Sequence, residues 1–249
     1  MKKPLAIADQ EFSNPRLASV YDALAGERDD LTIYRHLINE FTPSSLVDIG
    51  CGTGTLLSTL ADDGLRLVGV DPAEASLNVA RNKVDKNQVL WVLGGTESIT
   101  SHSFDMALMT GNVAQVFLTD AEWTSALADT HRALAAGGVF IFEARNPKSH
   151  CWEKWDRSNT HKRVVSPSLG LVESWCDVTD VSLPFVSFQW SFVFEADGAV
   201  LTSQSTIRFR TRGETETSLR DAGFKMLDVR EPISRFGEAL VYIANPCDE

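Results

Sequence analysis

The sequence predicts an α/β fold: a mostly parallel β-sheet flanked by helices, with an antiparallel β segment inserted late in the chain. From residue 46 onward, short apolar stretches rich in Val, Ile, Leu and Phe alternate with stretches of helical period. Between residues 162 and 210, strand signals dominate instead. A chain of 249 residues is long enough for one sizeable core that carries such an insertion. We therefore expect a single domain.

The first 45 residues predict a helical cap. Asn14 precedes Pro15, as expected for an N-cap residue followed by proline at the first helical position. Apolar residues then recur at helical spacing through residues 15–25 and again through residues 29–41. The Thr-Pro pair at residues 42–43 ends the second helix.

Alternating strands and helices follow this cap. The expected parallel strands are residues 45–50, 65–71, 88–94, 103–110 and 137–144. Two helix starts have the spacing of a capping box, Asp71 with Glu74 and Thr119 with Glu122. The glycine pair at residues 137–138 is expected to close the second of these helices.

The inserted segment predicts an antiparallel hairpin. Residues 185–210 read as two strands about an Asp197-Gly198 turn, and large aromatic residues alternate with polar ones on the first strand. This alternation is typical of a sheet with one covered face. A helix at residues 214–223 and strands at 224–231 and 238–246 then return to the α/β pattern.

We divide this single domain into three parts. Residues 1–45 form the helical cap, residues 46–145 and 211–249 form the core, and residues 146–210 form the inserted β segment, which we call the lid.

Three glycines at the end of the first predicted strand indicate a ligand site. Gly50, Gly52 and Gly54 stand between a strand and a helix, where an open α/β sheet forms its ligand crevice. Glycine allows the backbone to lie against a bound molecule. Asp71 ends the next predicted strand at the same edge, where a carboxylate can accept ribose hydroxyls. The alternatives stay open: a tight turn without a ligand, and Asp71 as an N-cap.

The identity of the nucleotide depends on the glycine spacing. A dinucleotide fingerprint places a glycine at the sixth position, where this chain has Thr55. Asp48 adds a negative charge two residues before the loop. This charge disfavours a pyrophosphate and suits a ligand that carries an ammonium or sulfonium group.

Four stretches together resemble the class I S-adenosylmethionine-dependent methyltransferases, in particular the bacterial enzymes that act on small molecules. They are residues 47–54, 68–81, 104–117 and 134–147. The resemblance implies a Rossmann-like sheet of seven strands whose last strand, residues 239–244, is antiparallel. It also implies S-adenosylmethionine as cofactor and an insertion after the fifth strand that covers the substrate.

The resemblance further implies the roles of individual residues. The methionine end of the cofactor would lie against Asp48, Gly50 and Gly52, and the ribose and adenine against Asp71 and Pro72. The floor next to the reactive methyl group would be Thr110, Gly111 and Asn112, and the N-terminal helices would close over the cofactor with Tyr21 and Arg28.

One stretch departs from the family pattern. The family usually has an acid after the third strand that accepts the adenine amine, and Gly95 stands in its place here. The contact would then come from Thr96, from Glu97 or from the backbone.

Candidate catalytic residues come from the approach to the lid and from the cap. We take His150 as the candidate general base, with Asn146 and Tyr21 as further candidates. The alternative, a solvated loop histidine, stays open, because histidine titrates near neutrality wherever it lies. Trp152 and Trp155 either form an aromatic wall for a cationic or planar acceptor or pack under the lid.

Composition limits the partners. The 23 basic and 34 acidic residues give a net charge of −11, without a basic cluster that would bind duplex nucleic acid or an anionic membrane. We expect a small-molecule partner and, through the lid sheet, a homodimer. The four cysteines form no CxxC pair and the histidines no metal-like spacing, which excludes a readable metal site and fits a reduced cytoplasm.

The sequence therefore predicts an enzyme that transfers a methyl group from S-adenosylmethionine to a nitrogen or oxygen of a small molecule. Two alternatives stay open: a nicotinamide-dependent oxidoreductase, and a catalytically silent module that binds S-adenosylmethionine.

Overall fold

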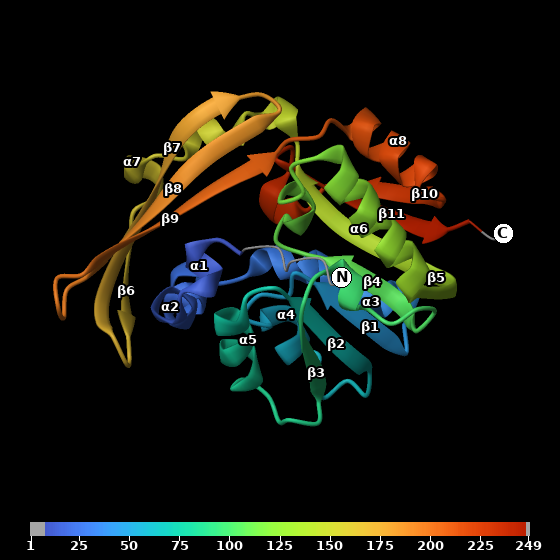
Figure 1. Ribbon diagram of the computed structural model, residues 1–249, viewed down its shortest axis with the longest axis horizontal. Helices are drawn as coiled ribbons and strands as arrows, with labels where there is room; N and C mark the ends of the chain where they lie inside the picture. The colour runs from blue at the N-terminus through green and yellow to red at the C-terminus, as the bar shows by residue number, and fades with distance from the viewer. Residues whose placement is uncertain (1–7, 248–249) are drawn as a thin grey trace.

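A central sheet of seven strands organises the protein, whose computed structural model describes residues 8–247. Its strands lie in the order β10-β11-β5-β4-β1-β2-β3 (Figure 1). Their bounds are β1 Ser45–Ile49, β2 Arg66–Asp71, β3 Val89–Leu93, β4 Phe104–Met109, β5 Leu134–Arg145, β10 Phe224–Arg230 and β11 Ala239–Pro246. Only β11 runs antiparallel to its neighbours β5 and β10. The predicted fold class is confirmed.

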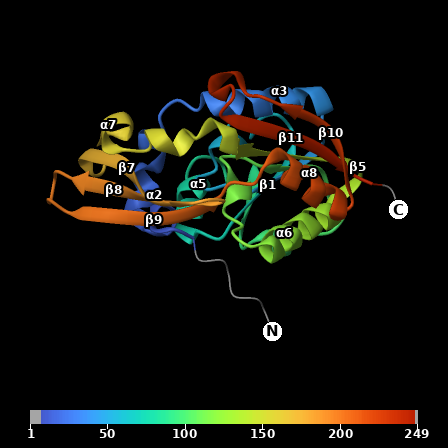
Figure 2. The ribbon, with the colours of Figure 1, turned by 90° about the horizontal axis from the view of Figure 1, so that it is seen from above.

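Helices cover both faces of this sheet (Figure 2). One apolar cluster joins α3 (Thr32–Phe41), α4 (Thr55–Ser58) and α5 (Glu74–Arg81) to one face. A second cluster joins α6 (Asp120–Ala133) and α8 (Arg212–Asp221) to the other face. Short 3₁₀ helices occupy the connections: η1 Asp29–Leu31, η2 Thr96–Ser98, η3 Val113–Gln115, η4 Pro147–Ser149, η5 Cys151–Lys154 and η6 Ile233–Arg235. The core is thus a three-layer α/β/α arrangement.

The inserted segment forms a separate antiparallel sheet in the order β6-β7-β8-β9. The bounds are β6 Lys162–Ser166, β7 Gly170–Ser182, β8 Phe185–Phe194 and β9 Val200–Arg208, with the short helix α7 (Arg157–Thr160) before them. The predicted hairpin is confirmed, because β8 and β9 pair up to Val193 and Val200 around the turn. Figure 1 shows this sheet extending from the core over α1 (Gln10–Ser13) and α2 (Pro15–Ala25).

The predicted cap contributes to both sheets. Asn14 caps α2 as predicted, since its side chain accepts the N–H groups of Arg16 and Leu17. Helix α2 packs its apolar side on the lid through Leu17 and Val20, whereas α3 packs on the central sheet. Residues 1–7 of the predicted cap lie outside the described residues.

Two predicted helix boundaries are wrong. Helix α5 begins at Glu74 after Ala73, so Asp71 is not its N-cap residue. Helix α6 ends at Ala133, and the glycine pair at residues 137–138 lies inside β5, between the residues Leu134 and Val139 that pair with β4. The capping box of Thr119 and Glu122 is confirmed. Strand β3 is less buried than predicted, because it forms an edge of the sheet.

Among residues 8–247, no helix is long and apolar enough to cross a bilayer. No group of three or more potential metal ligands occurs in the same part of the chain.

Candidate active site

A cavity of about 670 Å³ lies between the carboxyl ends of β1, β2 and β4 and the sheet of the lid. The chain enters the sheet at β1, extends it through β2 to β3, and then returns to the other side of β1 with β4. The crevice at such a reversal is the usual ligand site of open α/β sheets. Eleven predicted site residues line the cavity: Tyr21, Arg28, Asp48, Gly50, Gly52, Asp71, Pro72, Gly95, Thr96, Thr110 and Gly111.

Different physical constraints explain why glycine stands at the three loop positions. All have positive φ angles, 72° at Gly50, 54° at Gly52 and 72° at Gly54. A Cβ atom on Gly50 would lie 2.5 Å from Val113, and one on Gly54 would lie 2.4 Å from Trp91. A Cβ atom on Gly52 would meet nothing within 4 Å. Packing within the protein therefore explains two of the glycines, and only Gly52 borders open space.

Asp71 fastens this loop to strand β2. Its Oδ2 accepts the N–H of Gly52 and its Oδ1 accepts the N–H of Ala73, each at 2.8 Å. Burial raises the pKa of Asp71, and these two backbone bonds act in the opposite direction. A carboxylate has about four lone-pair sites, so two acceptor positions remain for a ligand. The contact with Gly52 was missed by sequence reasoning.

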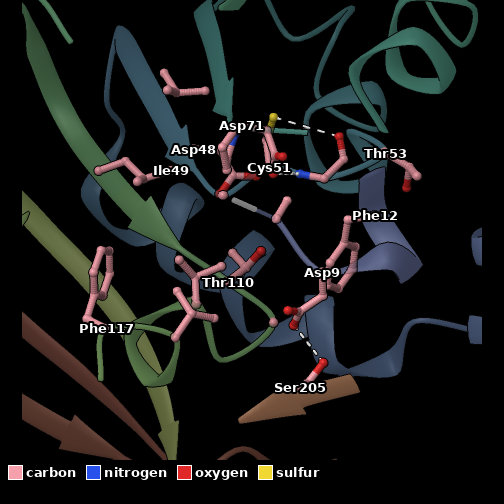
Figure 3. A pocket seen from close by; sticks show the side chains of 18 of the residues that line it. Asp9, Phe12, Asp48, Ile49, Cys51, Thr53, Asp71, Thr110, Phe117 and Ser205 are labelled. Atoms are coloured by element: carbon pink, nitrogen blue, oxygen red, sulfur yellow. Dashed lines mark hydrogen bonds between the residues drawn. The ribbon is translucent and has the colours of Figure 1, made fainter. Parts of the chain in front are cut away.

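Asp48 is the most unusual group of the site. Its residue is 1% exposed, and within the described residues its Oδ1 has no hydrogen-bond partner. Burial and the nearby Asp71 raise its pKa to about 8, against a smaller opposite effect of Arg28. Figure 3 shows Asp48 beside Asp71 at one end of the cavity. A cation or hydrogen-bond donor at this end would compensate the buried oxygen.

Arg28 and Tyr21 approach the cavity from the N-terminal helices. Two nitrogens of Arg28 donate to the two carboxylate oxygens of Asp30, at 2.8 and 2.9 Å. Burial and the nearby Glu11 raise the pKa of Tyr21 to about 12. The phenol therefore stays protonated at neutral pH and is suited to donate a hydrogen bond, not to act as a base.

Only part of the stretch expected near adenine, residues 95–97, lines the cavity. Gly95 and Thr96 line the cavity, and the Thr96 hydroxyl donates to Asp129 at 2.8 Å. Glu97 is not part of the lining, because its carboxylate turns back and accepts the N–H of Gly95 at 3.1 Å.

The same holds for residues 110–112, the expected floor next to the reactive methyl group. Thr110 and Gly111 line the cavity, whereas Asn112 is buried behind it. The N–H of Asn112 donates to Glu143, which also forms an ion pair with Arg235. The buried Glu143 thus connects the backbone of Asn112 to the half-buried Arg235.

Residues 46–138, which carry the glycine loop and Asp71, match the methyltransferase domain family. The ubiquinone biosynthesis O-methyltransferase of Ruegeria pomeroyi is 35% identical over 145 residues, which are 55% of this chain and 55% of that protein. The chain spans about half the length of the curated relatives it matches.

The core of this chain is thus similar to methyltransferase domains.

Solved structures of methyltransferases share the whole fold. A methyltransferase from Clostridium acetobutylicum has a TM-score of 0.74 and 18% identity, with 94% of this chain and 98% of that one covered. The sugar N-methyltransferase KedS8 from a Streptoalloteichus species has a TM-score of 0.74 and 16% identity, with 100% and 98% covered. The antiparallel last strand and the inserted sheet are therefore features of a methyltransferase fold.

Two candidate catalytic residues do not reach the cavity. Asn146 uses its side chain to cap η4 and to donate to the carbonyl of Gly237 at 3.3 Å. His150 is exposed and stacks on Trp152 with 5.0 Å between ring centroids. The open alternative of a solvated loop histidine agrees with this position.

The tryptophans pack under the lid. Trp152 meets Phe209 edge-on at 4.7 Å between centroids, and Trp155 meets Phe188 edge-on at 5.1 Å. Neither tryptophan lines the cavity, so the aromatic-wall alternative is not favoured.

Sequence reasoning missed most of the cavity wall that lies opposite the central sheet. Its further lining residues include Asp9, Phe12, Phe117, Thr179, Ser187, Phe188, Gln204, Ser205 and Thr206. The alternation of polar and aromatic residues in β8 indicated a two-faced sheet but not which face the cavity meets. That choice depends on contacts of the lid with distant segments such as α1, which local sequence does not encode.

Proposed function

We propose that this chain transfers a methyl group from S-adenosylmethionine to a nitrogen or oxygen of a small molecule. The observation that carries the proposal is the pairing of the open backbone at Gly52 with the buried, unpartnered oxygen of Asp48 at the sheet crevice. A ligand with a flat nucleoside fits against the Gly52 backbone, and its ammonium group would donate to the unpartnered oxygen of Asp48.

The residues at the end of the cavity that contains Asp48 and Asp71 suit S-adenosylmethionine. Asp48 would face its ammonium group, Asp71 its ribose, and Pro72 with Thr96 its adenine. When bound, the cofactor supplies an electrophilic methyl group on a sulfonium. The chain's own residues align the two reactants and exclude water, effects of order 7–11 kcal/mol in favourable cases. A general base is optional for an amine acceptor and more useful for a hydroxyl.

Calorimetry tests the cofactor site. We expect S-adenosylmethionine to bind in a 1:1 ratio, and Asp71→Ala to weaken binding about 10-fold to 100-fold, because it removes a ligand acceptor and the tie to Gly52. Asp63→Ala, the same change at an exposed position outside the cavity lining, is the control and should bind like the unchanged protein. Unchanged affinity in a folded Asp71→Ala protein refutes the site.

A nicotinamide-dependent oxidoreductase is the less favoured alternative. A pyrophosphate would meet the acids Asp48 and Asp71, and the dinucleotide fingerprint is incomplete at Thr55. A fluorescence titration with NADH should therefore show no saturable binding.

A catalytically silent module remains as the other alternative, motivated by the glycine at position 95. Incubation with labelled cofactor and metabolite extracts decides between methyl transfer and the silent module. Labelled products support transfer, and a chain that binds the cofactor but labels nothing supports the silent module.

Net charge and cysteine chemistry support a proposal about the compartment and the partners of the protein. We propose a cytoplasmic protein without nucleic-acid partners, because the net charge is −11 and Cys51, Cys151, Cys176 and Cys247 are all unpaired. The division into cap, core and lid, and a homodimer through the lid sheet, belong to the same proposal. A monomer mass in solution scattering would dismiss the dimer.

A further inference from the structure

The cavity has two chemically distinct halves. The half at the core contains the glycine loop, Asp48 and Asp71. The opposite half is built by the start of α1 and by the lid strands. It is lined by Asp9, Phe12, Ser187, Gln204, Ser205 and Thr206. Its polar groups are therefore hydroxyls, one amide and one carboxylate.

Asp9 is held at this second half by the lid. It stands at the N-cap position of α1, yet its side chain does not cap the helix. Its Oδ2 instead accepts the hydroxyl of Ser205 at 2.6 Å, as Figure 3 shows at the end of the cavity away from Asp48. Within residues 8–247, no hydrogen bond of the chain uses its Oδ1.

The charges of the lining favour a cationic acceptor. Among the described residues, the acidic and basic side chains that line the cavity are Asp9, Arg28, Asp48 and Asp71, and the fold keeps Asp48 largely protonated. Arg28 already donates twice to Asp30. Asp9 is thus the one charged group of the acceptor half in the described part of the chain. Anionic acceptors would meet repulsion there, whereas an ammonium group would form a charge-assisted hydrogen bond.

The same residues favour nitrogen over oxygen as the attacking atom. A hydroxyl acceptor benefits from a general base, and the lining contains no histidine or lysine among the described residues. Tyr21 stays protonated, since burial raises its pKa to about 12. Carboxylates are poor bases toward alkyl hydroxyls, but they bind amines directly.

We propose that the acceptor is a small polar amine, cationic at neutral pH and rich in hydroxyl groups, and that Asp9 binds its ammonium group. This rests on the proposed methyl transfer. The bound ammonium gives one proton to solvent. The nitrogen lone pair then forms the N–C bond while the C–S electron pair returns to sulfur. Positive charge thereby moves to the nitrogen, where the Asp9 carboxylate stabilises it.

A labelling experiment tests the acceptor class. The full chain is incubated with S-adenosylmethionine carrying a deuterated methyl group and with bacterial metabolite extracts. Labelled products are separated on a cation exchanger at pH 4 and analysed by mass spectrometry. We expect the labelled products to be retained as amines.

Kinetics with the unmethylated form of a labelled product test Asp9. Asp9→Asn keeps the shape and an acceptor for Ser205 but removes the charge, so KM should rise about 10-fold to 100-fold while cofactor affinity stays within about 2-fold. The matched control is Asp180→Asn, an exposed position on β7 outside the lining, which should leave KM unchanged. If Asp9→Asn does not fold, Ser205→Ala should raise KM about 2-fold to 10-fold by releasing Asp9.

The outcomes separate the two proposals. Neutral or acidic products, or an unchanged KM in the folded Asp9 and Ser205 variants, overturn the amine inference and leave methyl transfer intact. Failure to bind the cofactor, or no labelled product from any extract, overturns methyl transfer itself and the inference with it.

Discussion

Asp48 is a carboxyl group that the fold keeps largely protonated near neutral pH. Burial raises its pKa from 3.8 to about 8. The unfolded chain ionises this group near pH 4, whereas the folded chain retains the proton up to about pH 8. The folded state therefore binds more protons between these values, and stability falls as the pH rises through this window.

Asp48→Asn removes this pH dependence. The variant should match the unchanged protein in urea unfolding at pH 4 and exceed its free energy of unfolding at pH 8 by several kcal/mol, on the order of 4. Equal free energies of unfolding at both pH values would contradict the account of Asp48.

Ligand binding should also move this proton. An ammonium group beside Asp48 favours the ionised carboxylate, so cofactor binding at pH 7 should release about one proton. Calorimetry in buffers of different ionisation enthalpy measures the release, and Asp48→Asn should release none. The same release from both proteins would place the ammonium group elsewhere.

Gly52 and Gly54 form a matched pair, because both have positive φ angles and only Gly54 is packed against Trp91. Gly54→Ala should destabilise the protein by about 1–3 kcal/mol more than Gly52→Ala, through overpacking. Gly52→Ala should chiefly weaken cofactor binding, which titration of the folded variants checks. If Gly54→Ala weakens binding more at equal stability, the roles are reversed.

The glycine pattern illustrates what single residues reveal in advance. The spacing predicted a loop at the sheet edge, since glycine signals a backbone conformation. Which glycine borders the ligand depends on Val113 and Trp91, which come from distant segments. Asp9 was not predicted for the same reason, because its partner Ser205 lies 196 residues away.

Helix α2 connects the cap to the lid. Phe194 of β8 is fully buried against its apolar side, and Arg16 lies over the Phe194 ring at 3.7 Å from the centroid. Arg16 also forms an ion pair with the exposed Asp197 in the hairpin turn. The apolar contact should dominate, because exposed ion pairs contribute little.

Two substitutions in this contact separate the effects. Phe194→Ala should lower the free energy of unfolding by about 3–5 kcal/mol, through the cavity it leaves. Asp197→Ala should cost less than about 1 kcal/mol. Chemical denaturation measures both, and similar costs for the two variants would argue against an apolar contact between cap and lid.

Elements with local signals were predicted well, and elements set by pairing were not. Asn14-Pro15 and the Thr119 capping box act within one turn of helix, and both predictions are confirmed. The glycine pair at residues 137–138 resembled a helix end but lies inside β5, where the register with β4 is irregular. His150 was predicted at the substrate entrance because it follows β5 closely in the sequence. In the structure it ends η4 and is exposed.

The molecule as a whole contains two sheets (Figure 1). The cavity is lined by residues of both. The alternation of strands and helices was enough to predict the core, because parallel sheets follow from that pattern. The position of the lid relative to the core could not be predicted, since it depends on contacts between distant segments such as α1 and β9. The acceptor half of the site lies at this junction.

A crystal structure with S-adenosylhomocysteine tests the central claim most directly. The account predicts the ligand in the crevice, with its backbone contact at Gly52, its ammonium group at Asp48 and its ribose at Asp71. Its sulfur should point toward the half of the cavity that contains Asp9. A ligand bound elsewhere, or one whose ammonium group points away from Asp48, would contradict the account.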